Sequence, residues 1–237
     1  IFHIDHNLMA LAPRQILNNR YHIVSLLGQG AFGAVYRAWD LNLSRTCAVK
    51  ENLDISAEAQ KQFGYEATLL ANLSHPNLVR VTDYFFLPGQ GQYFVMDFIE
   101  GKDLEQMLAD GTPLPLDQVM QWIGQICDAL DYLHTQEPPI IHRDIKPGNI
   151  KIDPKGKATL VDFGIARFFK TGKASDTQKM GTPGYAAPEQ FGRAQTDARS
   201  DVYSLGVLLH QLLTRHEPWT TPFKLPLSRN INPVISP

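Results

Sequence analysis

Hydrophobic and polar residues alternate in short runs over the first hundred positions. Five runs have the length and the β-branched and aromatic content of strands. These runs are 21–27, 34–39, 46–50, 78–86 and 93–99. Glycines and a polar Asp-Leu-Asn run supply the turns between the first three. The pattern predicts a small antiparallel sheet, and everything before about Asn18 stays ambiguous.

One predicted helix interrupts these strands at residues 57–73, which are rich in good helix formers. Its apolar stripe is formed by Phe63, Ala67, Leu70 and Leu73. Glu66 lies within this span, on or beside the inward stripe. The His-Pro-Asn run at 75–77 is expected to end the helix.

The second half of the chain changes to helical periodicity. Apolar residues recur at three- and four-residue steps at Val119, Trp122, Ile123, Ile126, Leu130 and Leu133. This spacing predicts a long buried helix, and 201–213 repeats the pattern. The polar run 170–179 is the best candidate for a mobile loop. The fold class is therefore α+β, with strands early and helices late.

Composition narrows the classes of protein. With 237 residues the chain is long enough for a sizeable core, which we interpret as one domain with two lobes. The 22 basic and 24 acidic residues nearly balance, so nothing favours nucleic acid or an anionic membrane as the main partner. Cys47 and Cys127 are too few for a zinc framework. No run approaches the ~20 apolar residues that cross a bilayer.

The ends of the chain add two expectations. The N-terminus lacks the layout of a secretory signal, which predicts a cytoplasmic segment without membrane contact. The chain starts at Ile1 and reads as a piece of a longer protein, whose flanking regions could include membrane or sensor segments.

The run 142–149, His-Arg-Asp-Ile-Lys-Pro-Gly-Asn, places a carboxylate, an ammonium and an amide in one turn. Asp-Phe-Gly follows at 162–164 after a short strand-like segment. Phosphoryl transfer needs an acceptor for a hydroxyl proton, a cation for the moving group and oxygen ligands for Mg²⁺. Asp-Phe-Gly alone is most often an ordinary turn, so it indicates a catalytic role only together with further motifs in a fixed order.

Five motifs occur in one order along the chain. They are the glycine-rich 28–35, Ala-Val-Lys at 48–50, the run 142–149, Asp-Phe-Gly at 162–164, and 181–189 with Gly-Thr-Pro-Gly-Tyr and Ala-Pro-Glu. In this order they resemble the catalytic domain of eukaryotic-type (Hanks-type) serine/threonine protein kinases, and the residues of the motifs are most similar to those of bacterial members. The resemblance implies a bilobal fold with an N-lobe at about 21–96, a C-lobe at about 100–237 and an N-terminal extension at 1–20.

The resemblance also implies roles in ATP-dependent transfer to protein hydroxyls. Asp144 would be the catalytic base, and Lys146 would neutralise charge on the γ-phosphoryl group. Asn149 and Asp162 would hold Mg²⁺, for which Mn²⁺ is an expected substitute. Lys50 would reach the phosphates of ATP while paired with Glu66. The simplest alternatives are turn-forming Asp and Asn, a solvated strand-end lysine and a surface glutamate.

A second set of residues would bind the nucleotide. It comprises Gly28, Gly30, Gly33, Val35, Ala48, Lys50, Met96, Asp97, Ile99, Asp103 and Lys151. A strand rather than a helix follows the glycines, which favours a kinase hairpin over a dinucleotide-binding turn. Val35 and Ala48 also suit plain strand packing, and Asp103 also suits a helix cap. Lys151 departs from the family, which usually has an apolar residue there.

Regulation and substrate class are further expectations from the resemblance. Arg143 before the predicted base is typical of kinases whose activation loop is ordered by a phosphate. Candidate acceptors are Thr177, then Ser175 and Thr171. Lys146 and the Gly-Thr-Pro-Gly-Tyr run favour Ser or Thr in protein substrates, including the kinase itself.

The C-terminal part departs from the pattern. Beyond Trp219 no match is apparent, so the last C-lobe helices are expected to be missing. Glu189, if buried without the family's arginine partner, would destabilise the lobe. Two rival functions stay open, an ATP-binding pseudokinase or truncated scaffold and, with less support, a small-molecule phosphotransferase. The sequence does not identify the oligomeric state.

Overall fold

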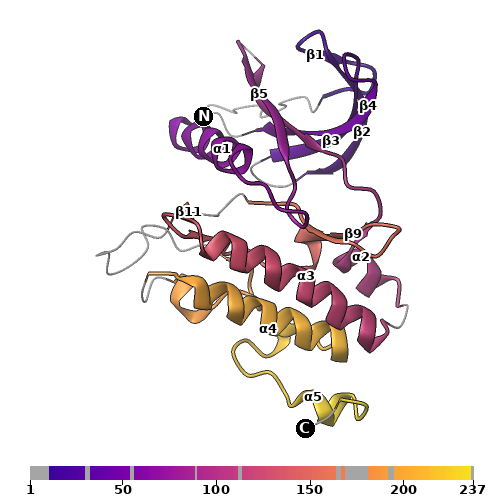
Figure 1. Ribbon diagram of the computed structural model, residues 1–237, viewed down its shortest axis with the longest axis vertical. Helices are drawn as coiled ribbons and strands as arrows, with labels where there is room; N and C mark the ends of the chain where they lie inside the picture. The colour runs from indigo at the N-terminus through magenta and orange to yellow at the C-terminus, as the bar shows by residue number, and fades with distance from the viewer. Residues whose placement is uncertain are drawn as a thin grey trace, which may run out of the picture. The chain divides into compact units, whose positions relative to one another are not determined.

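The computed structural model describes residues 11–29, 33–53, 56–88, 90–111, 114–163, 167–168 (backbone only), 181–191 and 195–235. The chain divides into two compact units. Unit 1 comprises the described part of Ile1–Leu73 together with Val79–Phe98. Unit 2 comprises Ser74–Leu78 and the described part of Ile99–Pro237. Figure 1 labels the α-helices and several of the strands.

Unit 1 is built on a six-stranded antiparallel sheet with the strand order β1-β2-β3-β4-β6-β5. Its strands are β1 (Ile16–Leu17), β2 (Tyr21–Gln29), β3 (Gly33–Asp40), β4 (Arg45–Asn52), β5 (Val81–Leu87) and β6 (Gly91–Asp97). The five predicted strands are confirmed as β2 to β6. The sequence pattern missed β1 and began β5 three residues early, because Leu78 forms an isolated bridge to Leu160 in unit 2 instead.

The predicted helix of unit 1 is α1 (Ala57–Ala71). Ser56 caps it, since its hydroxyl accepts a hydrogen bond from the backbone N–H of Ala59. Its predicted apolar stripe is buried, and the Phe63 ring packs 5.0 Å from that of Phe94 on β6. The helix therefore lies against the face of the sheet on which Phe94 projects.

A second core covers the other face of this sheet. It contains Leu11, Leu17, Tyr21, Ile23, Ala34, Tyr36, Ala38, Cys47, Val49, Tyr93 and Val95. Leu11 and Leu17 come from the segment predicted as an extension before residue 21. Backbone bonds hold this segment to β2, from Arg14 to Ile23 and from Ile23 to Gln15. Both faces of the central strands are consequently buried.

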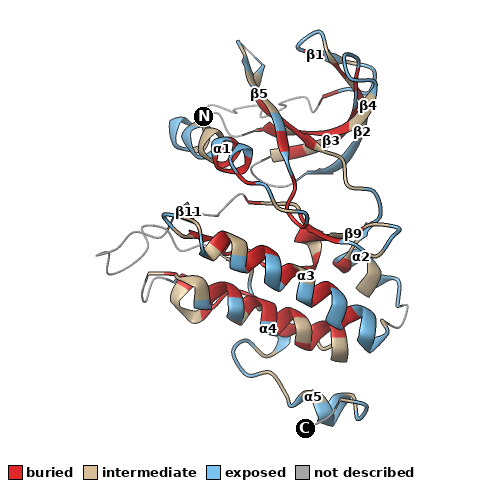
Figure 2. Cartoon of the chain, viewed as in Figure 1, coloured by how far each residue is buried: buried red, intermediate tan, exposed pale blue. Residues whose placement is uncertain are grey.

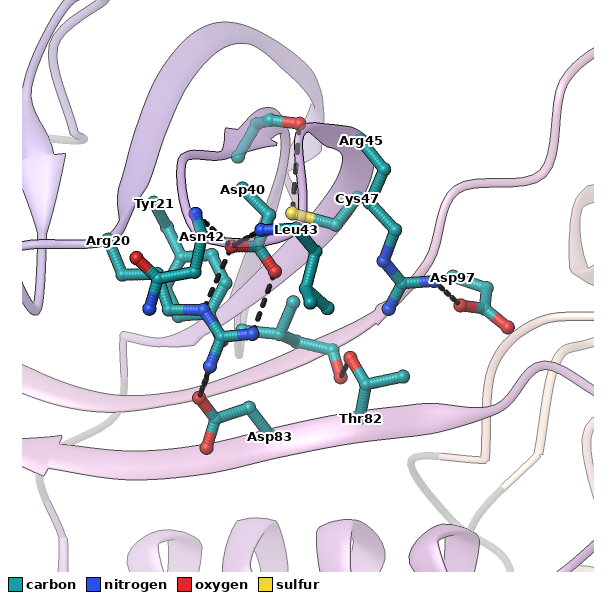
Figure 3. Close-up of polar contacts among 12 residues, drawn as sticks. Arg20, Tyr21, Asp40, Asn42, Leu43, Arg45, Cys47, Thr82, Asp83 and Asp97 are labelled. Atoms are coloured by element: carbon teal, nitrogen blue, oxygen red, sulfur yellow. Dashed lines mark hydrogen bonds and ion pairs between the residues drawn. The ribbon is translucent and has the colours of Figure 1, made fainter.

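Arg20 connects distant parts of unit 1 (Figure 3). Its Nε and Nη2 donate to the two carboxylate oxygens of Asp40 at 2.9 and 2.8 Å, and Nη1 lies 3.4 Å from Asp83 of β5. Asp40 also accepts from the backbone N–H groups of Asn42 and Leu43. The turn between β3 and β4 is thereby fixed to the start of β2.

Unit 2 is mainly helical. Its α-helices are α2 (Leu104–Ala109), α3 (Leu116–His134), α4 (Ala198–Thr214) and α5 (Ser228–Ile231). Its 3₁₀ turns are η1 (Pro147–Asn149), η2 (Pro188–Phe191) and η3 (Pro218–Thr220). The long helices predicted around 119–133 and 201–213 are confirmed as α3 and α4. Figure 2 shows the buried stripe on each of them.

Short strands complete unit 2. One sheet has the order β10-β9-β7, from β10 (Ala158–Leu160), β9 (Ile150–Ile152) and β7 (Lys102–Asp103). A second pairs β11 (Arg167–Phe168) with β8 (Ile140–Ile141). The strand-like segment expected between Asn149 and Asp162 is thus a hairpin. None of the described helices is both long and apolar enough to cross a membrane.

Candidate catalytic site

Lys50 on β4 and Glu66 on α1 form a partly buried ion pair. The distance from Nζ to Oε1 is 2.7 Å, and the side chains are 16% and 4% exposed. Nζ also lies 5.4 Å from the ring centroid of Phe94. The inward stripe of α1 brings the glutamate to the strand, so the ammonium is held in one direction rather than solvated.

Residues predicted to cover the adenine share the sheet face of Lys50. Val35 of β3 is paired directly with Lys50, and Ala48 of β4 is paired with Met96 of β6. Directly paired residues of neighbouring strands project from the same face. Ala48 and Met96 are buried, and Val35 is half-buried.

Of the three predicted glycines, Gly28 and Gly33 fall within described residues and Gly30 lies outside them. Gly28 is exposed beside an irregularity in the β2–β3 pairing. At Gly33 an added Cβ would lie 2.8 Å from the carbonyl oxygen of Glu51. The start of β3 therefore approaches β4 too closely for any side chain.

Asp97 ends β6 with its carboxylate bound by two arginines. Arg45 Nη1 donates to Oδ1 at 2.8 Å (Figure 3), and Arg80 Nε donates to Oδ2 at 3.1 Å. The backbone N–H of Asp97 donates to the carbonyl of Arg80. Ile99, the next predicted hinge residue, is half-buried in unit 2.

In unit 2, Asp103 caps α2. Its carboxylate accepts from the backbone N–H of Gln106 at 2.8 Å, and the Gln106 side chain accepts from the Asp103 N–H at 3.1 Å. This capping box is the alternative that the sequence left open for Asp103.

Lys151 of β9 is paired with Asp103 and donates from Nζ to the carbonyl oxygen of Gly101 at 3.2 Å. Gly101 has φ of +99°, and an added Cβ would lie 1.9 Å from the carbonyl oxygen of Ile152. Only glycine fits there. The lysine thus fastens the segment before α2 to β9 at the point where the two backbones touch.

The loop before β9 gathers the predicted catalytic groups around the Asp144 carboxylate. Thr182 donates from its hydroxyl to Oδ1 at 2.6 Å. Lys146 Nζ lies 2.8 Å from Oδ2 and donates to the Thr182 hydroxyl at 3.1 Å. Asn149 Nδ2 donates to Oδ2 and to the backbone carbonyl of Asp144, both at 2.9 Å. Asp144 is thus surrounded by a hydroxyl, an ammonium and an amide.

Asp201 at the start of α4 anchors this loop, and sequence reasoning missed its role. The carboxylate is fully buried and accepts from the backbone N–H groups of His142 at 2.9 Å and Arg143 at 2.7 Å. His134 Nε2 lies 2.8 Å from the same carboxylate. Arg143 has φ of +72°, a strained conformation for a residue with a side chain. Gln190 holds the Arg143 carbonyl at 2.8 Å.

His142 is a second residue whose role the sequence did not indicate. Its Nδ1 accepts from the backbone N–H of Asp144 at 3.3 Å, and its ring meets Phe163 edge-on at 4.7 Å. Complete burial lowers the pKa of His142, so the ring stays neutral. His142 therefore connects the backbone of Asp144 to Phe163, the residue that follows Asp162.

For Asp201, the sequence did contain one indication of a role, because an acidic residue stands at the start of a helix whose apolar stripe is buried.

The remaining predicted residues are the phosphosite candidates, Glu189 and Asp162. Thr171, Ser175 and Thr177 lie outside the described residues. Glu189 is half-buried and accepts from the Ser200 hydroxyl at 2.6 Å, so the condition under which it would destabilise the lobe is not met. Asp162 is half-buried before the buried Phe163, and its charge acts on the ring of His142.

The side chains around Asp144 are of the types that interact with a hydroxyl, a phosphate and Mg²⁺. Asn149 donates through its amide nitrogen Nδ2, so the amide oxygen is not used in that bond. An amide oxygen is a ligand that suits Mg²⁺. The Asp162 carboxylate is a second oxygen ligand of the kind that Mg²⁺ prefers. Such a metal takes few protein ligands and completes its shell with phosphate and water.

Comparison with known proteins agrees with this chemistry. The protein kinase domain family matches residues 21–231. The chain is 37% identical over 231 residues to serine/threonine-protein kinase pkn2 of Myxococcus xanthus, covering 93% of this chain and 27% of that protein. It is 37% identical over 221 residues to serine/threonine-protein kinase A of Synechocystis sp., covering 86% and 42%.

A third relative is serine/threonine-protein kinase PknB of Mycobacterium tuberculosis, 36% identical over 217 residues, with 86% of this chain and 34% of that protein covered. The chain spans less than half the length of these relatives. ATP and a divalent metal are used generally in this family, and its substrates are proteins. From the matched residues and the α+β architecture, the chain belongs to the protein kinase domain family.

Proposed function

We propose that this chain carries an ATP- and Mg²⁺-dependent serine/threonine protein kinase activity. One observation supports it above the others: a threonine hydroxyl donates to Asp144 at 2.6 Å while Lys146 lies 3.1 Å from the same hydroxyl oxygen. That is the environment that an acceptor alcohol needs. The names of the relatives favour Ser and Thr as acceptors.

In the proposed reaction the acceptor oxygen attacks the γ-phosphorus, and the bond from that phosphorus to the bridging oxygen of ADP breaks. Asp144 takes the hydroxyl proton late in the transfer. Lys146 balances negative charge on the moving group. His142 and Asp201 act through Asp144, because they fix the loop that carries it.

Lys50 is proposed to bind the α- and β-phosphates in the direction set by Glu66. Asn149 and Asp162 are proposed to hold Mg²⁺, which would neutralise the charge that develops on the phosphate oxygens. Val35, Ala48, Met96, Asp97, Ile99, Asp103, Lys151 and the glycines Gly28, Gly30 and Gly33 are proposed to bind the rest of the nucleotide.

Transfer of labelled phosphate from ATP tests this function. Wild type should label itself and a generic protein acceptor, with the label recovered as phosphoserine or phosphothreonine. Asp144→Asn should lose at least about a hundredfold in rate, the scale of general-base catalysis. Asp128→Asn is the matched control, because Asp128 is exposed on α3. It should keep the wild-type rate.

Transfer that survives in Asp144→Asn would refute the assigned base. A folded, ATP-binding wild type without transfer would support the pseudokinase alternative. Mapping phosphate in the active sample also tests the proposal that a phosphate orders the activation loop. Thr177 is the first expected acceptor, followed by Ser175 or Thr171. Their complete lack of phosphate in active protein would remove that proposal.

A further inference from the structure

A buried carboxylate directly beside Lys50 has no part in the proposed phosphoryl transfer. Glu51 follows Lys50 on β4, so their side chains project from opposite faces of the sheet. Lys50 faces α1, whereas Glu51 is 5% exposed within the second core of unit 1. An ionisable group is costly there unless its hydrogen bonds are satisfied.

Two buried tyrosines satisfy it. Tyr36 donates from its hydroxyl to Oε2 at 2.8 Å, and Tyr93 donates to Oε1 at 3.0 Å. The Tyr36 oxygen in turn accepts from the backbone N–H of Leu11 at 3.1 Å. We call Glu51, Tyr36 and Tyr93 the Glu51 pin. Each carboxylate oxygen thus has its own phenol donor.

The Glu51 pin crosses three neighbouring strands. Tyr36 belongs to β3, Glu51 to β4 and Tyr93 to β6, and Glu51 is directly paired with Tyr93. Apolar contacts tolerate small displacements of a strand, whereas hydrogen bonds depend steeply on distance and angle. Two such bonds on opposite sides hold β4 at one position between its neighbours.

The same stretch of β4 carries the groups that face the nucleotide in the proposed reaction. Lys50 is paired with Val35 on one side and Phe94 on the other. The carbonyl of Glu51 is the atom that an added Cβ at Gly33 would meet at 2.8 Å. A displacement of Glu51 therefore moves both Lys50 and the start of β3 after the glycine-rich run.

We propose that Glu51 is a positioning residue for Lys50, acting through the Glu51 pin from the opposite face of the sheet. This inference rests on the proposed function, because it concerns how Lys50 binds ATP. Glu66 sets the direction of the ammonium, and Glu51 sets the place of the backbone that carries it.

Glu51→Gln tests the inference with little change in shape. The amide keeps one acceptor oxygen, so the hydroxyl of one of the two phenols loses its acceptor. The Michaelis constant for ATP should rise about tenfold, the order expected for a displaced binding group, with kcat changed less than about threefold. Tyr36→Phe, which also breaks one bond of the pin, should raise the Michaelis constant in the same direction.

Val49→Ala is the matched control. Val49 is fully buried on the same strand and the same face and is directly paired with Tyr36. Its truncation removes apolar packing beside the pin but leaves the donors and acceptors of both hydrogen bonds in place. It should lower the melting temperature and leave the Michaelis constant for ATP within about twofold. Hydrogen exchange should be faster at the amides of residues 47–52 in Glu51→Gln than in Val49→Ala.

The inference is overturned if Glu51→Gln and Tyr36→Phe keep the wild-type Michaelis constant, or if Val49→Ala raises it equally. A wild type without phosphate transfer would instead reject the proposed function. Hydrogen exchange then still decides the inference, since equal exchange at 47–52 in the two variants refutes a pin at that position, and faster exchange in Glu51→Gln supports it.

Discussion

Three carboxylates show how neighbours determine what one chemical group does. Asp144 is half-buried among a hydroxyl, an ammonium and an amide, which suits a group that exchanges a proton. Asp201 is fully buried and accepts from two backbone N–H groups, which suits an anchor. Glu51 is buried between two phenols. The proposed catalyst is the most accessible of the three.

Glu51 should also give the stability of the protein a particular pH dependence. Burial raises the pKa of Glu51 above its ordinary value of 4.5, although the two tyrosine hydrogen bonds oppose the rise. A carboxyl with a raised pKa stabilises the fold below pH 4.5, and this contribution is lost as pH rises through the folded-state pKa. The loss is at most about 1.4 kcal/mol per pH unit between the two pKa values.

Urea unfolding of wild type and Glu51→Gln from pH 4 to 8 measures this contribution, because other groups titrate alike in both proteins. The free energy of unfolding of wild type, minus that of the variant, should fall as pH rises and then become constant. A difference that stays level over the whole range, or rises with pH, would contradict a raised pKa for Glu51.

At the scale of elements, periodicity predicted the structures that packing of one face determines. The stripe through Phe63 and Leu70 predicted α1 and placed Glu66 on its inward side. The alternation of β3 distinguished a hairpin from a dinucleotide-binding turn. These predictions succeeded because burial imposes a period of 3.6 or 2 on the sequence itself.

Features that depend on pairing with another part of the chain escaped prediction. Strand β1 has two residues and exists because Ile16 and Leu17 pair with β2. The role of Asp201 depends on the backbone of residues far from it in sequence, so a helical pattern shows only a polar residue at that position. Glu51 was likewise visible only as the residue after a lysine.

The segment before β2 gives a prediction at this scale. Deleting residues 1–19, which keeps Arg20, removes Leu11 and Leu17 from the second core, and burial of each leucine is worth about 2 kcal/mol. The free energy of unfolding measured in urea should fall by about 4 kcal/mol. Ile16→Ala is the control, because Ile16 is exposed on β1, and it should cost much less. Equal stability of the truncated protein and wild type would place the boundary of the folded domain after this segment.

At the scale of the molecule, the proposed reaction takes residues from both units. Lys50 and Glu66 belong to unit 1, and Asp144, Asn149 and Asp162 belong to unit 2. Each group is held within its own unit, Lys50 by Glu66 and the Asp144 loop by Asp201. A defect in either unit should therefore impair nucleotide binding while the other unit keeps its internal contacts.

Thermal unfolding with ATP and Mg²⁺ tests this dependence. A ligand at a hundred times its dissociation constant stabilises the folded state by about 2.7 kcal/mol, so the melting temperature of wild type should rise. Lys50→Met and Asp162→Asn should each reduce the rise, and EDTA should reduce it in wild type. Asp128→Asn should retain the full rise.

Because Asp162 is proposed to act through the metal, EDTA should have little further effect on Asp162→Asn. An equally large effect of EDTA on that variant would mean that the metal is held elsewhere, and a full rise in Lys50→Met would mean that Lys50 does not bind the phosphates.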